Sequence, residues 1–332
     1  MNILQFGCFG TNNYGDEMGA VAMRRMIRQV YPDAEITMLG SRGDLIAKNH
    51  KDLTDYATWG GGIEQLMDKT DLWIIGPGTI LGTALMPIAR ELKLLKKPYM
   101  LWGVSAAEPF QEEEATYHVI EGAKFVGVRD DYTRDLLASK GFPATVVADP
   151  LIGSVKGGKK EYEILTISWN AMQLPQKVCH EMNCALAAFI EAEYWLGLPS
   201  SWEPMNSFDN DCIPLREVAS LAGMEVIVPY DFQEVSDYLS TTSILLTSRL
   251  HLGITAIAAG AKVVFFGQQK CKRWLDTVGM AGAYAEDYGS ITVESLRKAY
   301  NVDGSKTIAL RLQRTAEKSS QLFSEELREC LA

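Results

Sequence analysis

Residues 243–267 read SILLTSRLHLGITAIAAGAKVVFFG, and this stretch decides the fold of the chain. It contains two apolar runs, Ile244–Leu246 and Val263–Phe266, of the length typical of buried strands. Between them, apolar residues recur at helical spacing at Leu250, Ile254 and Ile257. The pattern predicts a strand, a short helix and a second strand parallel to the first, which is the repeating unit of an α/β sheet.

The start of this helix has the composition of an anion site. Ser248 is placed to cap the helix and Gly260 to end it. Arg249 and His251 lie in the first turn, where free backbone N–H groups and the positive end of the helix dipole also attract anions. A solvated surface arginine and a structural histidine are the alternative interpretation.

The sequence Ser248-Arg249-Leu250-His251, followed by an Ala/Gly-rich helix and Lys270, resembles the signature of the polysaccharide pyruvyl transferase family. Members of that family transfer the enolpyruvyl group of phosphoenolpyruvate to a sugar as a ketal. The resemblance implies that these residues bind phosphoenolpyruvate, with Lys270 near the leaving phosphate and Lys272 as its alternate.

Composition limits the possible functions. The 332 residues include 32 Lys plus Arg and 42 Asp plus Glu, a formal charge of −10, which argues against a broadly basic nucleic-acid surface. The six cysteines lack the spacing of a zinc site, so we expect free thiols and no metal. No apolar stretch approaches the roughly 20 residues that span a bilayer. The first strand, Ile3–Phe6, lacks signal-peptide features, so we expect a cytoplasmic protein with at most peripheral membrane contact.

A Gly-rich loop follows this first strand and opens a helix that runs through Val30. Its glycines do not fit the GxGxxG dinucleotide fingerprint. Instead, residues 13–17 (NYGDE) resemble the N-x-G-D-E segment of pyruvyl transferases, which implies substrate binding by Asn13, Gly15 and Asp16. The alternative is a structural role, in which the carboxylates of Asp16 and Glu17 stabilise the first turn of the helix.

The alternation of strands and helices continues through the first half of the chain. Predicted strands are Glu35–Leu39, Leu72–Ile75, Pro98–Trp102, Lys124–Val128 and Ala144–Ala148, with a helix at 83–96 and polar residues up to Tyr56. A turn at Gly76–Gly82 resembles the family's Gly-rich turn, which implies that a ligand approaches the backbone at Gly76 and Gly78. The alternative is a tight turn between a strand and a helix with no ligand contact.

An arginine again follows a strand at Arg129, which opens a helix ending near Gly141. It resembles the arginine of the family's G-x-R-D/E element, although Tyr132 and Thr133 replace the usual serine. We expect Arg129 to bind substrate, with Arg134 as its rival. Asp149-Pro150 resembles the family's closing D-P pair.

The second half repeats the α/β pattern. It begins with a strand at Tyr162–Ser168 and a helix at Cys184–Leu196. A loop rich in Trp and Pro follows at 194–214; its Trp side chains either bury themselves and anchor the loop or stack on the faces of a sugar. We expect two Rossmann-like doubly wound domains of the glycosyltransferase type B (GT-B) class. Their predicted bounds are 1–152 on the acceptor side, a linker at 153–160, 161–305 on the donor side, and a helix at 306–332 that packs back on the first domain.

The chemistry implied by the resemblance is ketal formation without a cofactor. His251 is the expected general acid or phosphate donor, and Arg249 and Arg129 are expected to hold the anionic ends of phosphoenolpyruvate. The acceptor would be a saccharide or a lipid-linked saccharide, and no nucleic acid partner is expected. A nucleotide-sugar glycosyltransferase, or a non-catalytic sugar-binding protein of the same fold, stays open.

Overall fold

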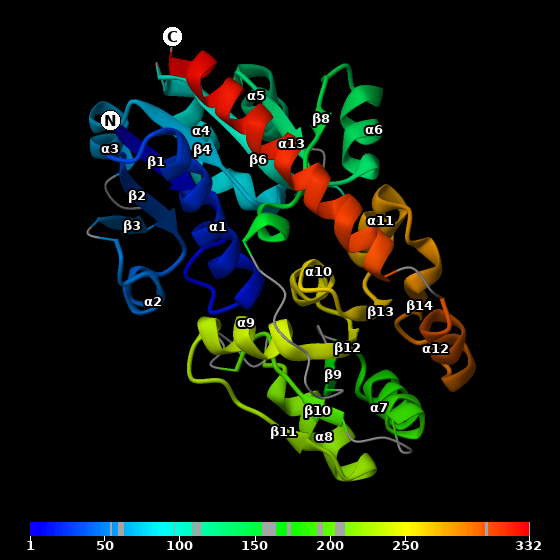
Figure 1. Ribbon diagram of the computed structural model, residues 1–332. Helices are drawn as coiled ribbons and strands as arrows, with labels where there is room; N and C mark the ends of the chain where they lie inside the picture. Colours follow the sequence, from blue (N-terminus) through cyan, green and yellow to red (C-terminus); the bar gives the residue numbers. More distant parts are fainter. Residues whose placement is uncertain are drawn as a thin grey trace. The chain divides into compact units, whose positions relative to one another are not determined.

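The computed structural model describes residues 1–53, 55–58, 63–95, 97–107, 110, 114–154, 164–170, 174–190, 195–202, 210–302 and 305–331. The chain forms two compact units (Figure 1). The N-terminal unit comprises 1–11, 16–150 and 314–332, and the C-terminal unit comprises 12–15 and 151–313. The short segment Asn12–Gly15 therefore belongs to the unit formed by the second half of the chain.

The described strands of the N-terminal unit form one parallel eight-stranded sheet. Its order is β3-β2-β1-β4-β6-β7-β8, and β5 pairs with β6 off this path. The strands are β1 (Asn2–Phe6), β2 (Glu35–Gly40), β3 (Tyr56–Thr58), β4 (Leu72–Ile75), β5 (Gly78–Leu81), β6 (Tyr99–Ala106), β7 (Val126–Val128) and β8 (Thr145–Val146). Parallel strands buried on both faces explain the nearly continuous apolar runs of β1 and β4.

Helices cover both faces of this sheet. Its helices are α1 (Tyr14–Val30), α2 (Gly43–Asn49), α3 (Ile63–Lys69), α4 (Met86–Leu94), α5 (Glu114–Gly122) and α6 (Asp131–Ser139). One core packs α4, α5 and α6 against the sheet. The other packs α1 and the end of α13 (Ser305–Leu331) against it (Figure 1). In this core the centroid of the Phe323 ring lies 4.9 Å from that of the Trp102 ring.

The C-terminal unit has the Rossmann strand order. Its sheet runs β11-β10-β9-β12-β13-β14, all parallel, which in chain order is 3-2-1-4-5-6. The strands are β9 (Ile164–Ser168), β10 (Trp195–Gly197), β11 (Glu225–Val226), β12 (Thr242–Thr247), β13 (Lys262–Gly267) and β14 (Tyr284–Asp287). The order reverses between β9 and β12, so their carboxyl ends form the position where such sheets bind ligands.

Two helical layers enclose this sheet as well. Helices α7 (Gln176–Ile190), α8 (Cys212–Ala222) and α12 (Val293–Tyr300) share one core with the sheet. On the other face, α10 (Leu250–Ala258) packs so closely on β13 that a Cβ at Gly253 would lie 2.0 Å from the Phe265 ring. Phe265 also contacts Trp274 of α11 (Gln269–Val278), and α9 (Phe232–Thr241) lies beside α10. The predicted doubly wound α/β class is confirmed.

The end of α10 shows how local sequence sets a boundary. Gly260 has φ +84° in the left-handed region, its N–H donates to the Ile257 carbonyl at 2.8 Å, and the Ala261 N–H donates to the Ala256 carbonyl at 2.8 Å. These two bonds form a Schellman motif, which glycine favours because it has no Cβ. The prediction that Gly260 ends the helix is confirmed.

Several elements differ from the expectation. The polar stretch before Tyr56 contains α2, a short helix that buries only Ile46, and the predicted turn at 76–82 contains β5. The helix predicted at Cys184–Leu196 corresponds to α7, which begins earlier, at Gln176, and Trp195 is part of a strand and of the core. Most of the predicted linker, 155–160, and part of the predicted loop, 203–209, lie outside the described residues.

Candidate functional site

The carboxyl ends of β9 and β12 bring together the residues of the SRLH sequence. Ser168 and Thr247 are paired at the ends of these strands, and the Ser248 N–H donates to the Ser168 carbonyl at 3.1 Å. Helix α10 begins directly after, with Arg249 as its N-cap residue. Arg249 and His251 therefore lie at the point of the C-terminal unit where the strand order reverses.

Arg249 forms a buried two-point ion pair that the sequence did not predict. Its Nε donates to Asp211 Oδ2 at 3.0 Å and its Nη2 to Asp211 Oδ1 at 2.5 Å. Asp211 is fully buried and Arg249 is 7% exposed. Because both oxygens of the carboxylate face the guanidinium fork, Arg249 is held in one orientation and its charge is balanced.

Asp211 also receives hydrogen bonds from two other segments. Asn170 Nδ2 donates to it at 2.9 Å from the residues after β9, and the Ser200 N–H donates at 2.9 Å from the residues after β10. Sequence reasoning placed Asp211 inside a long loop, so this residue was missed. The available signal was an acid directly before the helix that begins at Cys212, although Asp211 does not cap that helix.

Ser248 does not cap α10, which corrects the prediction. Its Oγ accepts the Asn170 N–H at 3.1 Å and also bonds the Tyr288 hydroxyl, while Thr247 Oγ1 accepts the Arg249 N–H at 2.9 Å. Leu250 has its side chain in the core, 2% exposed. Any contact of Leu250 with a ligand is therefore limited to its backbone N–H, which has no acceptor within the helix.

Tyr288 closes the same edge of the sheet after β14. Its hydroxyl donates to the Asn170 carbonyl at 3.0 Å, and Gln268 Nε2 lies 3.3 Å from that hydroxyl. A Cβ at Gly267, which has φ +81°, would lie 2.2 Å from the Tyr288 ring. Burial raises the pKa of Tyr288 to about 12, so its hydroxyl is a neutral donor at physiological pH.

His251 lies against the N-terminal segment of the same unit. A Cβ built on Gly15 would be 1.9 Å from His251 Nδ1, a distance that no real Cβ contact shows. Gly15 N–H donates to Asn13 Oδ1 at 2.9 Å, which orders the turn beside the ring. The structure thus brings together Asn13, Gly15 and His251, from two motifs that are far apart in the sequence.

Lys270, expected near the leaving phosphate, lies in a helix that follows β13 directly. It is the second residue of α11, half-buried in the helix's first turn. Its alternate, Lys272, is exposed and its Nζ lies 3.2 Å from Asp276 Oδ2 on the same helix. Between the two lysines, Lys270 is the one nearer to the end of β13.

Arg129 is buried inside the N-terminal unit. Its Nη2 donates to Thr79 Oγ1 at 2.6 Å, its Nε donates to Ser105 Oγ at 3.1 Å, and its Nη1 lies 3.6 Å from Asp149 Oδ2. The rival Arg134 is exposed and pairs with neighbouring carboxylates on α6. The buried group is therefore Arg129, with the aspartate of the D-P pair as its counter-ion.

Gly76 and Gly78 have backbone conformations that explain the choice of glycine. Their φ angles are +125° and +136°, and a Cβ at Gly76 would lie 2.1 Å from the Trp102 carbonyl oxygen. The peptide between Gly76 and Pro77 is cis. Only glycine allows β4 to turn here into β5, so these positions have a structural reason besides the predicted ligand contact.

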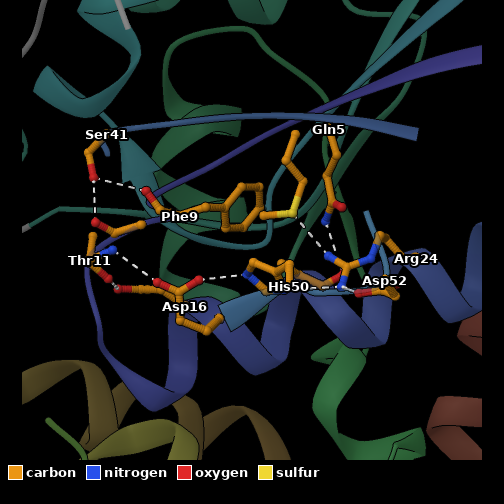
Figure 2. Close-up of polar contacts among 12 residues, drawn as sticks. Gln5, Phe9, Thr11, Asp16, Arg24, Ser41, His50 and Asp52 are labelled. Atoms are coloured by element: carbon orange, nitrogen blue, oxygen red, sulfur yellow. Dashed lines mark hydrogen bonds and ion pairs between the residues drawn. The ribbon is translucent and has the colours of Figure 1, made fainter. Parts of the chain in front are cut away.

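Asp16 and Glu17 fasten the loop that follows β1 (Figure 2). Asp16 Oδ2 accepts the Thr11 hydroxyl proton at 2.9 Å, and Glu17 Oε1 accepts the Thr11 N–H at 2.9 Å. Glu17 is buried, with Oε2 2.7 Å from His50 Nε2. His50 Nδ1 lies 3.1 Å from Arg24 Nη2, and since a guanidinium can only donate, His50 carries its proton on Nε2 and donates it to Glu17.

The described part of the chain lacks both a metal-ligand cluster and a membrane-spanning helix. No three His, Cys, Asp or Glu side chains there are grouped so that they could ligate a metal ion. None of the helices there combines the length and the apolar character that crossing a bilayer requires.

Solved structures with similar folds are nucleotide-sugar enzymes. UDP-GlcNAc 2-epimerase from Neisseria meningitidis, bound to UDP-GlcNAc, has a TM-score of 0.60 at 11% identity, covering 99% of this chain and 100% of that one. MnaA from S. aureus, solved with UDP, has a TM-score of 0.64 at 12% identity, covering 100% and 97%. Medicago truncatula UGT71G1 with UDP-glucose has a TM-score of 0.60 at 9% identity, covering 100% and 98%. At these identities the likeness defines the fold class, GT-B, as predicted.

The family follows from the sequence itself. A family model for polysaccharide pyruvyl transferase matches residues 13–269, from the Asn13 turn to the start of α11. The chain therefore belongs to the polysaccharide pyruvyl transferase family, and the predicted resemblance is confirmed. Lys270 lies one residue beyond the match. A search of curated protein sequences found no match to the chain.

Proposed function

We propose that this transferase moves the enolpyruvyl group of phosphoenolpyruvate onto a saccharide, or a lipid-linked saccharide, and forms a pyruvate ketal. The observation that carries the proposal is the meeting of the two family motifs in the C-terminal unit. Gly15 lies against His251, and His251 follows Arg249 at the first turn of α10. A titratable imidazole and an arginine thus lie two residues apart in sequence at a helix start, where an anionic donor is favoured.

In this proposal the helix start binds the donor. Phosphoenolpyruvate carries a carboxylate and a phosphate, which suit the N–H groups of the first turn of α10 and the guanidinium of Arg249. Asp211 fixes the orientation of that guanidinium but also balances its charge. A further cation is therefore needed for the phosphate, and Lys270 is the candidate because it lies in the first turn of α11, just after β13.

The proposed chemistry needs one proton donor and two acceptor hydroxyls. His251, as imidazolium, gives a proton to the methylene carbon of phosphoenolpyruvate while a sugar hydroxyl attacks C2 and loses its own proton to solvent. The C–O bond to phosphate then breaks and inorganic phosphate leaves with its electron pair. A second sugar hydroxyl attacks C2, its proton passes to solvent or phosphate, and the ketal closes with a methyl group where the methylene was.

The first experiment tests donor binding. Phosphoenolpyruvate at 100 times its dissociation constant should stabilise the native state by about 2.7 kcal/mol and raise Tm, while UDP-sugars should have a smaller effect. Arg249→Lys should reduce the shift because lysine cannot reproduce the two-point fork. An increase in Tm with UDP-sugars and none with phosphoenolpyruvate would support a glycosyltransferase instead.

The second experiment tests turnover. Phosphate release from phosphoenolpyruvate is measured against a panel of glycans and glycolipids, and the active acceptor is then used with variants. His251→Gln should lower kcat by about 10²- to 10⁴-fold while it retains donor binding. His180→Gln is the matched control because that side chain is 62% exposed on α7. Full turnover of the His251 variant would remove it from the proposed mechanism.

A further inference from the structure

The segment Asn12–Gly15 is fixed to the C-terminal unit by Tyr14. Tyr14 is fully buried, its N–H donates to the Ser200 carbonyl at 2.9 Å, and its ring meets the Phe232 ring edge-on at 6.3 Å between centroids. The N-terminal residues that belong to this unit are therefore held by backbone and ring contacts rather than lying loosely on its surface.

The Tyr14 hydroxyl reaches the helix that carries His251. It donates to Thr255 Oγ1 at 3.3 Å and lies 3.1 Å from Ser236 Oγ. Thr255 follows His251 by four residues on α10, so the two side chains lie on one face of the helix, one turn apart. Burial raises the pKa of the Tyr14 hydroxyl, which keeps it protonated as a donor. Tyr14 thus holds the segment next to His251.

Gly15 supplies the second part of this arrangement. A Cβ there would lie 1.9 Å from Nδ1, 2.5 Å from Cγ and 2.8 Å from Cβ of His251, so the ring occupies the space that any other side chain would need. Asn13 Oδ1 accepts the Gly15 N–H and fixes the turn in this orientation. The Nδ1 edge of the imidazole is consequently covered by the backbone of Gly15.

We infer that Tyr14 and Gly15 are positioning residues for His251. Tyr14 anchors the segment to α10, and the backbone of Gly15 lies against the Nδ1 side of the ring, so that the two residues together set the orientation of the imidazole. The effect on catalysis rests on the proposed function. The positioning of the His251 ring by residues 12–15 does not depend on that function and can be tested without an activity assay.

The test reads the imidazole directly. The chain has four histidines, so the ¹³Cε1 resonance of His251 in histidine-labelled protein is assigned as the signal missing from His251→Gln. Gly15→Ala should change the shift and the titration midpoint of that resonance, and Tyr14→Phe should change them in the same direction. Gly19→Ala is the matched control, since it lies one turn further along α1 and its Cβ would meet Pro77 instead of His251.

Kinetics then separates positioning from stability. Gly15→Ala should lower kcat by about 10²-fold, the order expected when a catalytic group moves by about 1 Å, with little change in the KM for phosphoenolpyruvate. Tyr14→Phe should lower kcat less, and it keeps the test open if Gly15→Ala does not fold. The inference is overturned if the His251 resonance titrates as in the wild type in both variants, or in Tyr14→Phe alone when Gly15→Ala does not fold.

The two readouts distinguish the two proposals. If the wild type releases no phosphate with any acceptor but the His251 resonance responds to Gly15→Ala, the proposed function fails and the positioning role stands. If the wild type is active and the resonance is unchanged in both variants, the positioning role fails and the proposed function stands.

Discussion

Removing Asp211 should destabilise the C-terminal unit more than any other single charge change at the site. Asp211→Ala takes away the acceptor of four donors: Arg249 Nε at 3.0 Å, Arg249 Nη2 at 2.5 Å, Asn170 Nδ2 at 2.9 Å and the Ser200 N–H at 2.9 Å. The variant leaves the Arg249 charge buried without its counter-ion, since Arg249 is only 7% exposed.

The magnitude follows from that burial. Breaking a buried ion pair by removing one partner costs about 3–5 kcal/mol, and leaving the neutral donors of Asn170 and Ser200 unsatisfied adds to this loss. A folded domain is stable by only about 5–15 kcal/mol, so we expect Asp211→Ala to lose roughly a fifth or more of the unit's stability. Replacing both members, with Asp211→Leu and Arg249→Met, should recover most of the loss.

The assay is urea unfolding followed by tryptophan fluorescence, because Trp169 and Trp195 are buried in the core of this unit. Asp135→Ala is the matched control. Its carboxylate is 68% exposed and pairs with Arg134 on the surface, so its loss should cost less than about 1 kcal/mol. If Asp211→Ala costs no more than this control, or if the double variant shows additive losses, the account of a buried Arg249–Asp211 pair is wrong.

Three other predictions concern separate parts of the molecule. Burial raises the pKa of Tyr288 from 10.0 to about 12, so the protonated Tyr288 hydroxyl stabilises the fold fully below pH 10, and this stabilisation is lost between about pH 10 and 12. Tyr288→Phe should therefore show a smaller fall in Tm at alkaline pH than the wild type. An identical fall in Tm would contradict this. Phe323→Ala should lower the free energy of unfolding by about 3–5 kcal/mol because the buried ring packs on Trp102, and an unchanged urea midpoint would show that α13 does not stabilise the sheet. Arg134→Ala should leave phosphate release unchanged because its guanidinium is exposed; a loss of release would make Arg134 the donor ligand.

The α/β architecture was predictable because it depends on local patterns. The apolar runs before and after α10 are long enough to show a strand, and Gly260 marks the end of the helix between them. Where elements are short, the pattern fails: β10 has three residues, and the tryptophan at its start was assigned to a helix. Two- and three-residue strands obtain their stability from neighbouring strands rather than from their own periodicity.

The site was predictable only in part, because its partners come from distant segments. Arg249 and His251 are evident from one stretch of sequence, but Asp211 and Gly15 meet them only through the fold. An arginine at a helix start looks the same in sequence whether it faces a ligand or a buried carboxylate. The pairing of Arg129 with Asp149 has the same origin, since a D-P pair at the end of a strand reads as a turn.

The measurement that tests the central claim most directly is the transfer reaction in D₂O with an acceptor found by the phosphate-release screen. Protonation of the methylene carbon of phosphoenolpyruvate should place one deuteron in the methyl group of the ketal, with one phosphate released per ketal formed. His251→Gln should form this CH₂D product far more slowly than the wild type. A sugar product formed from a UDP-sugar, with no phosphate released from phosphoenolpyruvate and no deuterium in a methyl group, would contradict the claim.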